Sequence, residues 1–99
     1  MMLRVVFHAP TPEALDRARR NLLNFRVADP EAELVIIANA GAVSAALANP
    51  DPDTDAALLV CRRTLANAGI TNQRQLAETD SAVVEIARRQ AKGWQYIRS

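Results

Sequence analysis

Residues 56–70 read AALLVCRRTLANAGI, in which a short apolar run, the only cysteine and a helical pattern follow one another directly. The run from Leu58 to Val60 has the length and apolar character of a strand that is buried on both faces. Gly69 is the residue type that most readily takes the left-handed conformation just past a helix end. We therefore predict a strand that ends at Cys61 and a helix that starts there and stops at Gly69.

The first half of the chain alternates in the same way. Residues 3–7 and 33–38 are apolar runs typical of buried strands, and a helical pattern follows each of them. Thr11 is placed to cap the first helix. The predicted inner face of that helix contains Leu15, Ala18, Leu22 and Phe25, and Arg17, Arg19 and Arg20 are expected to point elsewhere. Apolar strands that alternate with helices predict a parallel sheet with helices on both faces.

The pattern is less regular after Ile70. We expect a helical turn over residues 71–77, and residues 78–80 lie where a strand is needed but are polar. Asp80 or Ser81 is predicted to cap a helix, and residues 94–98 alternate as a short last strand does. The residues of this helix that we predict to face inward are Val83, Val84, Ile86 and Ala87.

Length and composition limit the class of protein. Ninety-nine residues make one domain, residues 1–99, with a thin core. Twelve basic and eleven acidic residues give a net charge of +1, so we expect neither nucleic acid nor membrane as a partner. No secretory signal and no apolar run of about 20 residues is present, and one cysteine makes no internal disulfide. A cytoplasmic location is expected.

The candidate site residues follow the predicted strands. In an open α/β sheet the carboxyl ends of the strands meet at one edge, where ligands bind. Cys61 lies there, at the start of a helix and beside Arg62, which favours the thiolate, the nucleophilic form that also carries persulfide sulfur. The alternative is that Cys61 only fills the end of a buried strand, since free cysteine is often buried.

Three other residues belong to the same predicted edge. His8 is a candidate general base for Cys61, or a histidine bonded to a backbone carbonyl at a strand end. Asn39 and Gly41 flank a strand-to-helix turn whose N–H groups either bind an anion or only make the turn. One cysteine and one histidine do not make a metal site within one chain, so we predict no metal and no cofactor.

Three segments carry a family resemblance. The pattern LLVCR-x-TL (residues 58–65), followed by AGI (residues 68–70), resembles the cysteine segment of small DsrE/DsrF-like, sulfur-relay-type proteins. Residues 81–98 are similar to the ending of one subgroup of that family, and VVFH (residues 5–8) fits the same subgroup. The resemblance implies a three-layer α/β/α sandwich on a mainly parallel five-stranded sheet, assembled as trimers or hexamers. It also implies a persulfide-carrying role for Cys61.

The chain departs from this family at three places. Arg63 stands where the subgroup has Asn, residues 49–55 make a short connection, and residues 78–80 are polar where a fourth strand is expected. Two functions therefore stay open. In the first, an oligomeric, sulfurtransferase-type thiol protein takes sulfane sulfur from a donor protein onto Cys61 and hands it to an acceptor protein. In the second, a non-catalytic module of the same fold uses this edge to bind a small ligand or to assemble.

Overall fold

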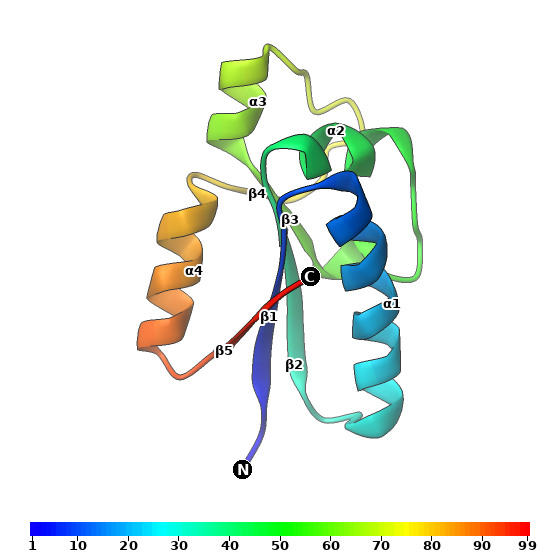
Figure 1. Ribbon diagram of the computed structural model, residues 1–99, viewed down its shortest axis with the longest axis vertical. Coiled ribbons are helices and arrows are strands. Elements are labelled where there is room, and N and C mark those ends of the chain that lie inside the picture. The colour runs from blue at the N-terminus through cyan, green and yellow to red at the C-terminus, as the bar shows by residue number, and fades with distance from the viewer.

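The strands form at the apolar runs of the sequence and make one sheet in the order β4-β3-β2-β1-β5. The computed structural model describes residues 1–99, and Figure 1 shows the sheet in the middle of the molecule with helices on both sides. All the strand pairs are parallel, which confirms the predicted three-layer α/β/α sandwich. The strands are β1 (Arg4–Ala9), β2 (Glu33–Ala38), β3 (Leu58–Cys61), β4 (Glu78–Thr79) and β5 (Gln95–Arg98).

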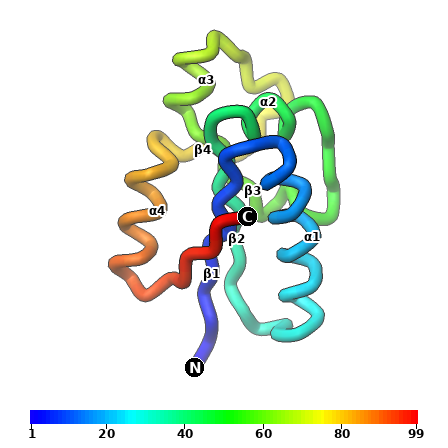
Figure 2. The backbone as a smooth tube through the Cα atoms, viewed as in Figure 1, coloured from blue at the N-terminus to red at the C-terminus, as the bar shows by residue number.

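The order of the strands decides which face each helix covers. Strands β1, β2, β3 and β4 lie side by side in the order in which they occur along the chain. Strand β5 then pairs with the free edge of β1. Because crossovers between parallel strands are right-handed, this reversal puts the last helix on the opposite face. Figures 1 and 2 show the first helix on one side of the sheet and the last helix on the other. The helices are α1 (Pro12–Ala28), α2 (Gly41–Ala48), α3 (Arg62–Ala68) and α4 (Ala82–Ala91), and η1 (Asp55–Ala57) is a single 3-10 turn.

The core is divided by the sheet into two unequal parts. Alternate residues of a strand point to opposite faces, so Phe7 faces α1 and α2, and Val6 faces α4. The cluster on the side of α1 has 15 buried residues, and the cluster on the side of α4 has six. Only Ala82 and Ile86 of α4 are buried. The short helix α4 therefore covers this second face of the sheet.

The predicted inner face of α4 is wrong at three positions. Val83 is 65% exposed, Val84 is 41% exposed, and Ala87 is also exposed. Only Ile86 of the predicted set is buried, together with Ala82. Residues at positions i and i+4 share one side of a helix, and the sheet contacts α4 along that side alone. No other element lies against the opposite side of α4, so its valines stay in solvent (Figure 1).

Helix α1 confirms its predicted cap and most of its inner face. The Thr11 hydroxyl accepts a hydrogen bond from the Ala14 N–H at 3.0 Å, and Leu15, Ala18 and Leu22 are buried. The prediction that Arg19 points away from the core is wrong, because this residue is only 8% exposed. Its burial is explained by acidic partners that lie far along the chain.

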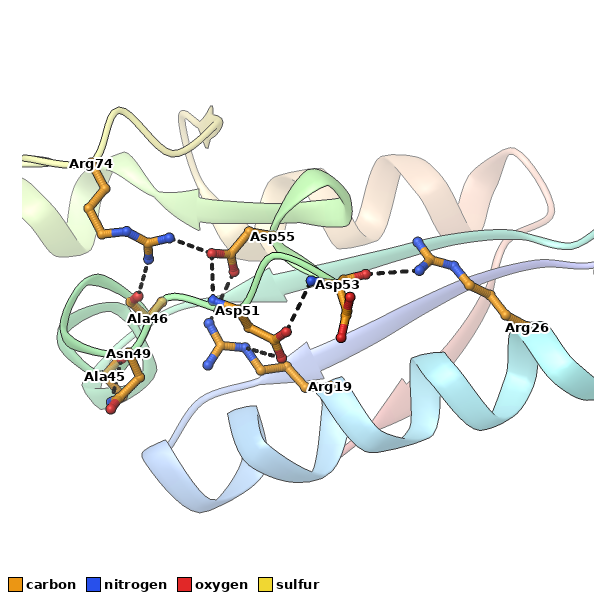
Figure 3. A network of polar contacts seen from close by, with 9 residues as sticks. All are labelled: Arg19, Arg26, Ala45, Ala46, Asn49, Asp51, Asp53, Asp55 and Arg74. Atoms are coloured by element: carbon orange, nitrogen blue, oxygen red, sulfur yellow. Dashed lines mark hydrogen bonds and ion pairs between the residues drawn. The ribbon is translucent and has the colours of Figure 1, made fainter.

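Arg19 belongs to a network of polar contacts that Figure 3 shows. Its guanidinium group donates to Asp55 Oδ1 at 3.1 Å, and Arg74 binds the other carboxylate oxygen of Asp55. Arg74 also donates to the Ala46 carbonyl at 2.7 Å. Asp55 thus joins α1, the turn before β3 and the loop after α3, with Arg74 extending the network to α2.

The loop before β4 differs from its predicted form. Residues 71–77 contain no helical turn, because the Asn72 side chain accepts from the Leu76 N–H at 3.0 Å and donates to its carbonyl at 2.8 Å. Such local side-chain bonds compete with helix. Strand β4 forms in spite of its polarity, because Glu78 pairs with Arg62, and Thr79 donates to Glu85 at 3.0 Å.

Candidate functional site

Cys61 lies where the sequence predicted it, as the last residue of β3 and the residue before α3. The residue is 5% exposed, and its neighbour in the sheet is Thr79 of β4. Its Sγ atom accepts a hydrogen bond from the backbone N–H of Ala82, the first residue of α4, at 3.4 Å. The sulfur therefore lies between the end of a strand and the start of a second helix.

The surroundings of the sulfur favour its ionised form. Burial by itself raises the pKa of the Cys61 thiol. The hydrogen bond from the Ala82 N–H lowers the pKa, the backbone and hydroxyl of Thr64 and the N–H of Arg63 add to this effect, and together they outweigh the burial. The pKa of Cys61 is therefore below its ordinary value of 9.0. A thiolate is the nucleophilic form of cysteine.

Arg62 has partners other than the sulfur. Its Nε atom donates to Glu78 Oε1 at 2.9 Å, and its NH1 group binds Asp80. The hydrogen bond to Glu78 raises the pKa of Arg62, and bonds from Asn72 and Arg62 lower the pKa of Glu78. Two carboxylates thus share the charge of Arg62. From the sequence we expected this charge to stabilise the Cys61 thiolate. The hydrogen bond to Cys61 comes from the backbone N–H of Ala82 instead.

A polar cleft of about 570 Å³ opens next to the cysteine, between β4 and the start of α4. Its walls include Thr79 and Ser81. Thr79 is the strand neighbour of Cys61, and Ser81 directly precedes the residue whose N–H binds the sulfur. Cys61 itself does not line the cleft. The cleft reaches the residues that enclose the thiol.

His8 and Asn39, two of the predicted site residues, are brought together, and a third residue joins them. His8 Nε2 lies 3.0 Å from Asn39 Oδ1, and His8 Nδ1 lies 2.7 Å from the Tyr96 hydroxyl. Since an amide oxygen only accepts, the neutral ring carries its proton on Nε2 and accepts from the tyrosine at Nδ1. The sequence did not indicate Tyr96 as a partner, because only the pairing of β5 with β1 places it there.

The structure does not bring His8 to Cys61. The strand register aligns His8 with Ile37, and Ile37 with Leu59, so β2 lies between the two residues. Neighbouring strands are about 4.8 Å apart, which separates β1 from β3 by roughly 10 Å. No hydrogen bond joins the two side chains. His8 is therefore not positioned to act directly as the base for this thiol.

The turn before α2 is held by one hydrogen bond to α3 and one within the turn itself. The Ala40 N–H donates to the Thr64 hydroxyl at 3.1 Å, and the Asn39 carbonyl accepts from the Ala42 N–H. Gly41 begins α2 close to Pro12, whose Cδ atom lies 3.4 Å from the position that a Cβ on Gly41 would take. The amide of Ala40 in this turn therefore already has a partner.

No cluster of three or more His, Cys, Asp or Glu residues has the geometry to hold a metal ion. None of the helices has the length and apolar character that crossing a membrane requires. Models of known protein families do not match this chain, and no curated protein matches it.

Proposed function

We propose that Cys61 is a nucleophilic thiol that accepts a sulfane sulfur atom from a persulfide donor and transfers it to an acceptor. The observation that carries this proposal is the hydrogen bond from the Ala82 N–H to Cys61 Sγ. A backbone N–H in the first turn of a helix presents partial positive charge, which favours a thiolate over a thiol. The resemblance of residues 58–70 to the cysteine segment of sulfur-relay-type proteins supports the same role.

The transfer needs no external oxidant or reductant. The Cys61 thiolate attacks the outer sulfur of a donor R–S–SH, a new S–S bond forms, and R–S⁻ leaves with the electron pair of the broken bond. The product is Cys61–S–SH. An acceptor thiolate then attacks the outer sulfur of this persulfide, and the Cys61 thiolate is the leaving group. The Ala82 N–H stabilises negative charge on Sγ at the start and at the end of the cycle.

The approach to the sulfur is narrow, because Cys61 is only 5% exposed. The cleft beside it has Thr79 and Ser81 in its wall, so we propose that a donor comes along this side. The charge on the sulfur is stabilised by the backbone and Thr64, so the step does not depend on His8. The carrier role thus rests on the thiol and its hydrogen-bond donors.

Intact-mass analysis of the native protein tests the proposal after exposure to a small persulfide donor. We expect a gain of one sulfur atom, which a reducing agent removes. The Cys61→Ser variant is the matched control, because serine preserves the size of the side chain and the chain has no other cysteine. If the folded protein gains no sulfur, or if the serine variant gains as much, the carrier proposal is wrong.

The burial of Cys61 favours a second candidate function, a non-catalytic module that binds a ligand or a partner at the same edge of the sheet. In that case the thiol reacts with an alkylating reagent only after denaturation. A carrier reacts in the folded state. The two functions therefore make opposite predictions for the alkylation of the native protein.

A further inference from the structure

The two edges of the sheet differ in how they are protected. Strand β4 forms one edge, and it has only two residues, with Glu78 in the strand and Asp80 directly after it. Strand β5 forms the other edge with four residues, all exposed, and contains no acidic residue and no proline. Figures 1 and 2 show β5 in front of β1, with no other element over it. Because short strands, charges and prolines keep sheet edges from pairing, the β5 edge is the more open of the two to a further strand.

The backbone groups on the free side of β5 follow from its pairing with β1. The Ser99 N–H donates to the His8 carbonyl at 2.9 Å, so the backbone of Ser99 faces β1. Consecutive residues of a strand direct their N–H and C=O groups alternately to one side and the other, so Ile97 also faces β1. The backbone groups of Tyr96 and Arg98 therefore point away from the sheet and have no strand to pair with.

The side chains of this edge differ between the two faces of the sheet. The Tyr96 hydroxyl lies 2.7 Å from His8 Nδ1, which holds the tyrosine ring beside β1. Arg98 lies on the same face as Tyr96 and forms no ion pair within the chain. Ile97 lies on the other face and is 37% exposed. The edge thus offers an aromatic ring and a cation on one face and an aliphatic side chain on the other.

The flank of α4 on the side of β5 carries no charge. The polar cleft lies between α4 and β4, and Glu85 and Arg88 of α4 line it. A helix turns by about 100° per residue, which places Val83, Ala87 and Gln90 on the opposite flank. This flank therefore contributes no charge that would repel a second copy at the β5 edge.

The β5 edge is complementary to itself. In an antiparallel pair of β5 strands about a two-fold axis at Ile97, Tyr96 of each copy lies opposite Arg98 of the other. The outward N–H and C=O groups of these two residues then bond to each other. The Arg98 guanidinium group lies beside the Tyr96 ring of the other copy, which attracts a cation, and the two Ile97 side chains meet on the opposite face. We propose that β5 pairs in this way with β5 of a second copy and joins the two sheets into one.

The length of the strand sets the strength of the association. Strand β5 has four residues, and a standard stable interface buries about 800 Å² on each partner, which is more than a strand of this length supplies. The dimer should accordingly be weak and depend on protein concentration, with a dissociation constant in the micromolar range or above.

Sedimentation of the full chain over a wide concentration range tests the proposal. We expect the original chain to pass from monomer to dimer as the concentration rises. Arg98→Pro removes an N–H that points away from β1, so it should block the second copy and leave the pairing with β1 in place. Arg98→Ala is the matched control, because it keeps the N–H and loses only the contact with the Tyr96 ring. Arg98→Pro should dimerise at least about tenfold more weakly than Arg98→Ala, because each copy then loses a hydrogen bond across the axis.

A disulfide across the axis tests the orientation and the register. In the proposed pair the two Ile97 Cα atoms are about 4.5 Å apart, a distance that a disulfide spans. Ile97→Cys in the Cys61→Ser background, which leaves one thiol per chain, should therefore give a covalent dimer on mild oxidation with glutathione disulfide. Gln95→Cys in the same background is the matched control. Gln95 is also exposed and lies on the same face, but its two copies would be about 14 Å apart and should not link.

The results that would overturn the proposal are distinct. A chain that stays monomeric up to about 1 mM, far above micromolar affinity, would leave the edge to a strand of another protein. Equal dimerisation of Arg98→Pro and Arg98→Ala would show that the copies meet elsewhere. No covalent dimer of Ile97→Cys, or equal linking of Gln95→Cys, would exclude the proposed register. Circular dichroism of each variant establishes that it is folded.

The β5 edge and the cysteine are separate in the sheet, because β1 and β2 lie between β5 and β3. A failure of dimerisation therefore leaves the proposed role of Cys61 untouched, and a failure of sulfur uptake leaves the proposed strand pairing untouched.

Discussion

The backbone N–H of Ala82 donates a hydrogen bond to Cys61 Sγ across 21 positions of the chain. Ser81 precedes α4, but its side chain makes no capping bond, so the sulfur satisfies one of the free N–H groups at the start of this helix. The same contact lowers the pKa of the thiol against the effect of burial. One hydrogen bond thus joins β3 to α4 and favours the thiolate.

The pH dependence of alkylation should show this effect directly. We expect the rate for the native protein to rise with a midpoint below pH 9.0, the ordinary value for a thiol, and the rate in denaturant to rise near that value. Between the folded and unfolded pKa values the unfolded chain binds more protons, so stability increases with pH there and the gain is complete above about pH 9. Urea unfolding should show this increase for the original chain and not for Cys61→Ser. Identical pH profiles for both proteins would contradict the prediction.

Replacing Thr64 should weaken the stabilisation of the thiolate. Thr64→Val removes the hydroxyl that contributes to the low pKa of Cys61, so the midpoint of native alkylation should move upward. The same change removes the acceptor of the Ala40 N–H and should destabilise the fold by about 1 kcal/mol. The control is Thr54→Val, because the Thr54 hydroxyl is buried without a partner. Its loss should neither raise the midpoint of alkylation nor destabilise the fold. An unchanged midpoint in Thr64→Val would show that the backbone donors alone set the pKa.

Removing Asp55 should destabilise the fold strongly. The side chain of Arg19 is 9% exposed, and Asp55 is its hydrogen-bonded partner. Asp55→Ala therefore leaves a buried charge whose remaining ion-pair partner is Asp51, at 3.8 Å. We expect a loss of about 3 kcal/mol in the free energy of unfolding, measured with urea. Asp53→Ala is the matched control, because Asp53 is exposed, and Arg26 binds its backbone carbonyl rather than its carboxylate. That variant should stay within about 0.5 kcal/mol of the original. Equal losses in the two variants would contradict the role of the network.

The same network should respond to acid. Burial raises the pKa of Asp55, but the Asp51 N–H, Arg74 and Arg19 lower it by more than burial raises it. The pKa of Asp55 therefore lies below its ordinary value of 3.8. A carboxylate with a lowered pKa contributes all of its stability above the unfolded value and loses it as the pH falls through the folded value. The difference in unfolding free energy between the original and Asp55→Ala should be constant from neutral pH to about pH 4 and should shrink below pH 3.8. A difference that persists unchanged in strong acid would exclude this titration.

Two glycines should respond oppositely to alanine. Gly69 has a φ of +65°, and a Cβ there meets nothing within 4 Å, so the whole cost of Gly69→Ala comes from the left-handed backbone and is about 1–2 kcal/mol. Gly41 begins α2 without a positive φ, and its Cβ would lie 3.4 Å from Pro12, at ordinary contact distance. Gly41→Ala should therefore be neutral or slightly stabilising, because alanine favours helix over glycine. Thermal unfolding of both variants measures the contrast.

The local parts of the fold were predictable from the sequence. Strand β2 spans the predicted residues 33–38, and β3 ends at Cys61. Gly69 is left-handed, and the Ile70 N–H donates to the Leu65 carbonyl, as in the predicted helix ending. These features depend on residues within a few positions of one another, so short patterns are enough to specify them.

The candidate site was predictable only in part. The placement of Cys61, His8 and Asn39 at strand ends follows from the alternation of strands and helices. Their partners do not, because the Tyr96 hydroxyl reaches His8 from a strand 88 positions away. Arg19 was misplaced for the same reason, since Asp55 lies 36 positions further along the chain. An amphipathic pattern does not reveal such distant partners.

By itself, the sequence determined that this chain forms a parallel α/β sheet and that its cysteine lies between a strand and a helix, because apolar periodicity and capping residues act locally. Only the tertiary structure decided that the Cys61 sulfur meets the start of α4, that His8 does not reach it, and that Val83 and Val84 face solvent. Each of these outcomes depends on which strands become neighbours and which helix faces they cover. The choice of neighbouring strands is made when distant segments pack together, so no short stretch of sequence contains this information.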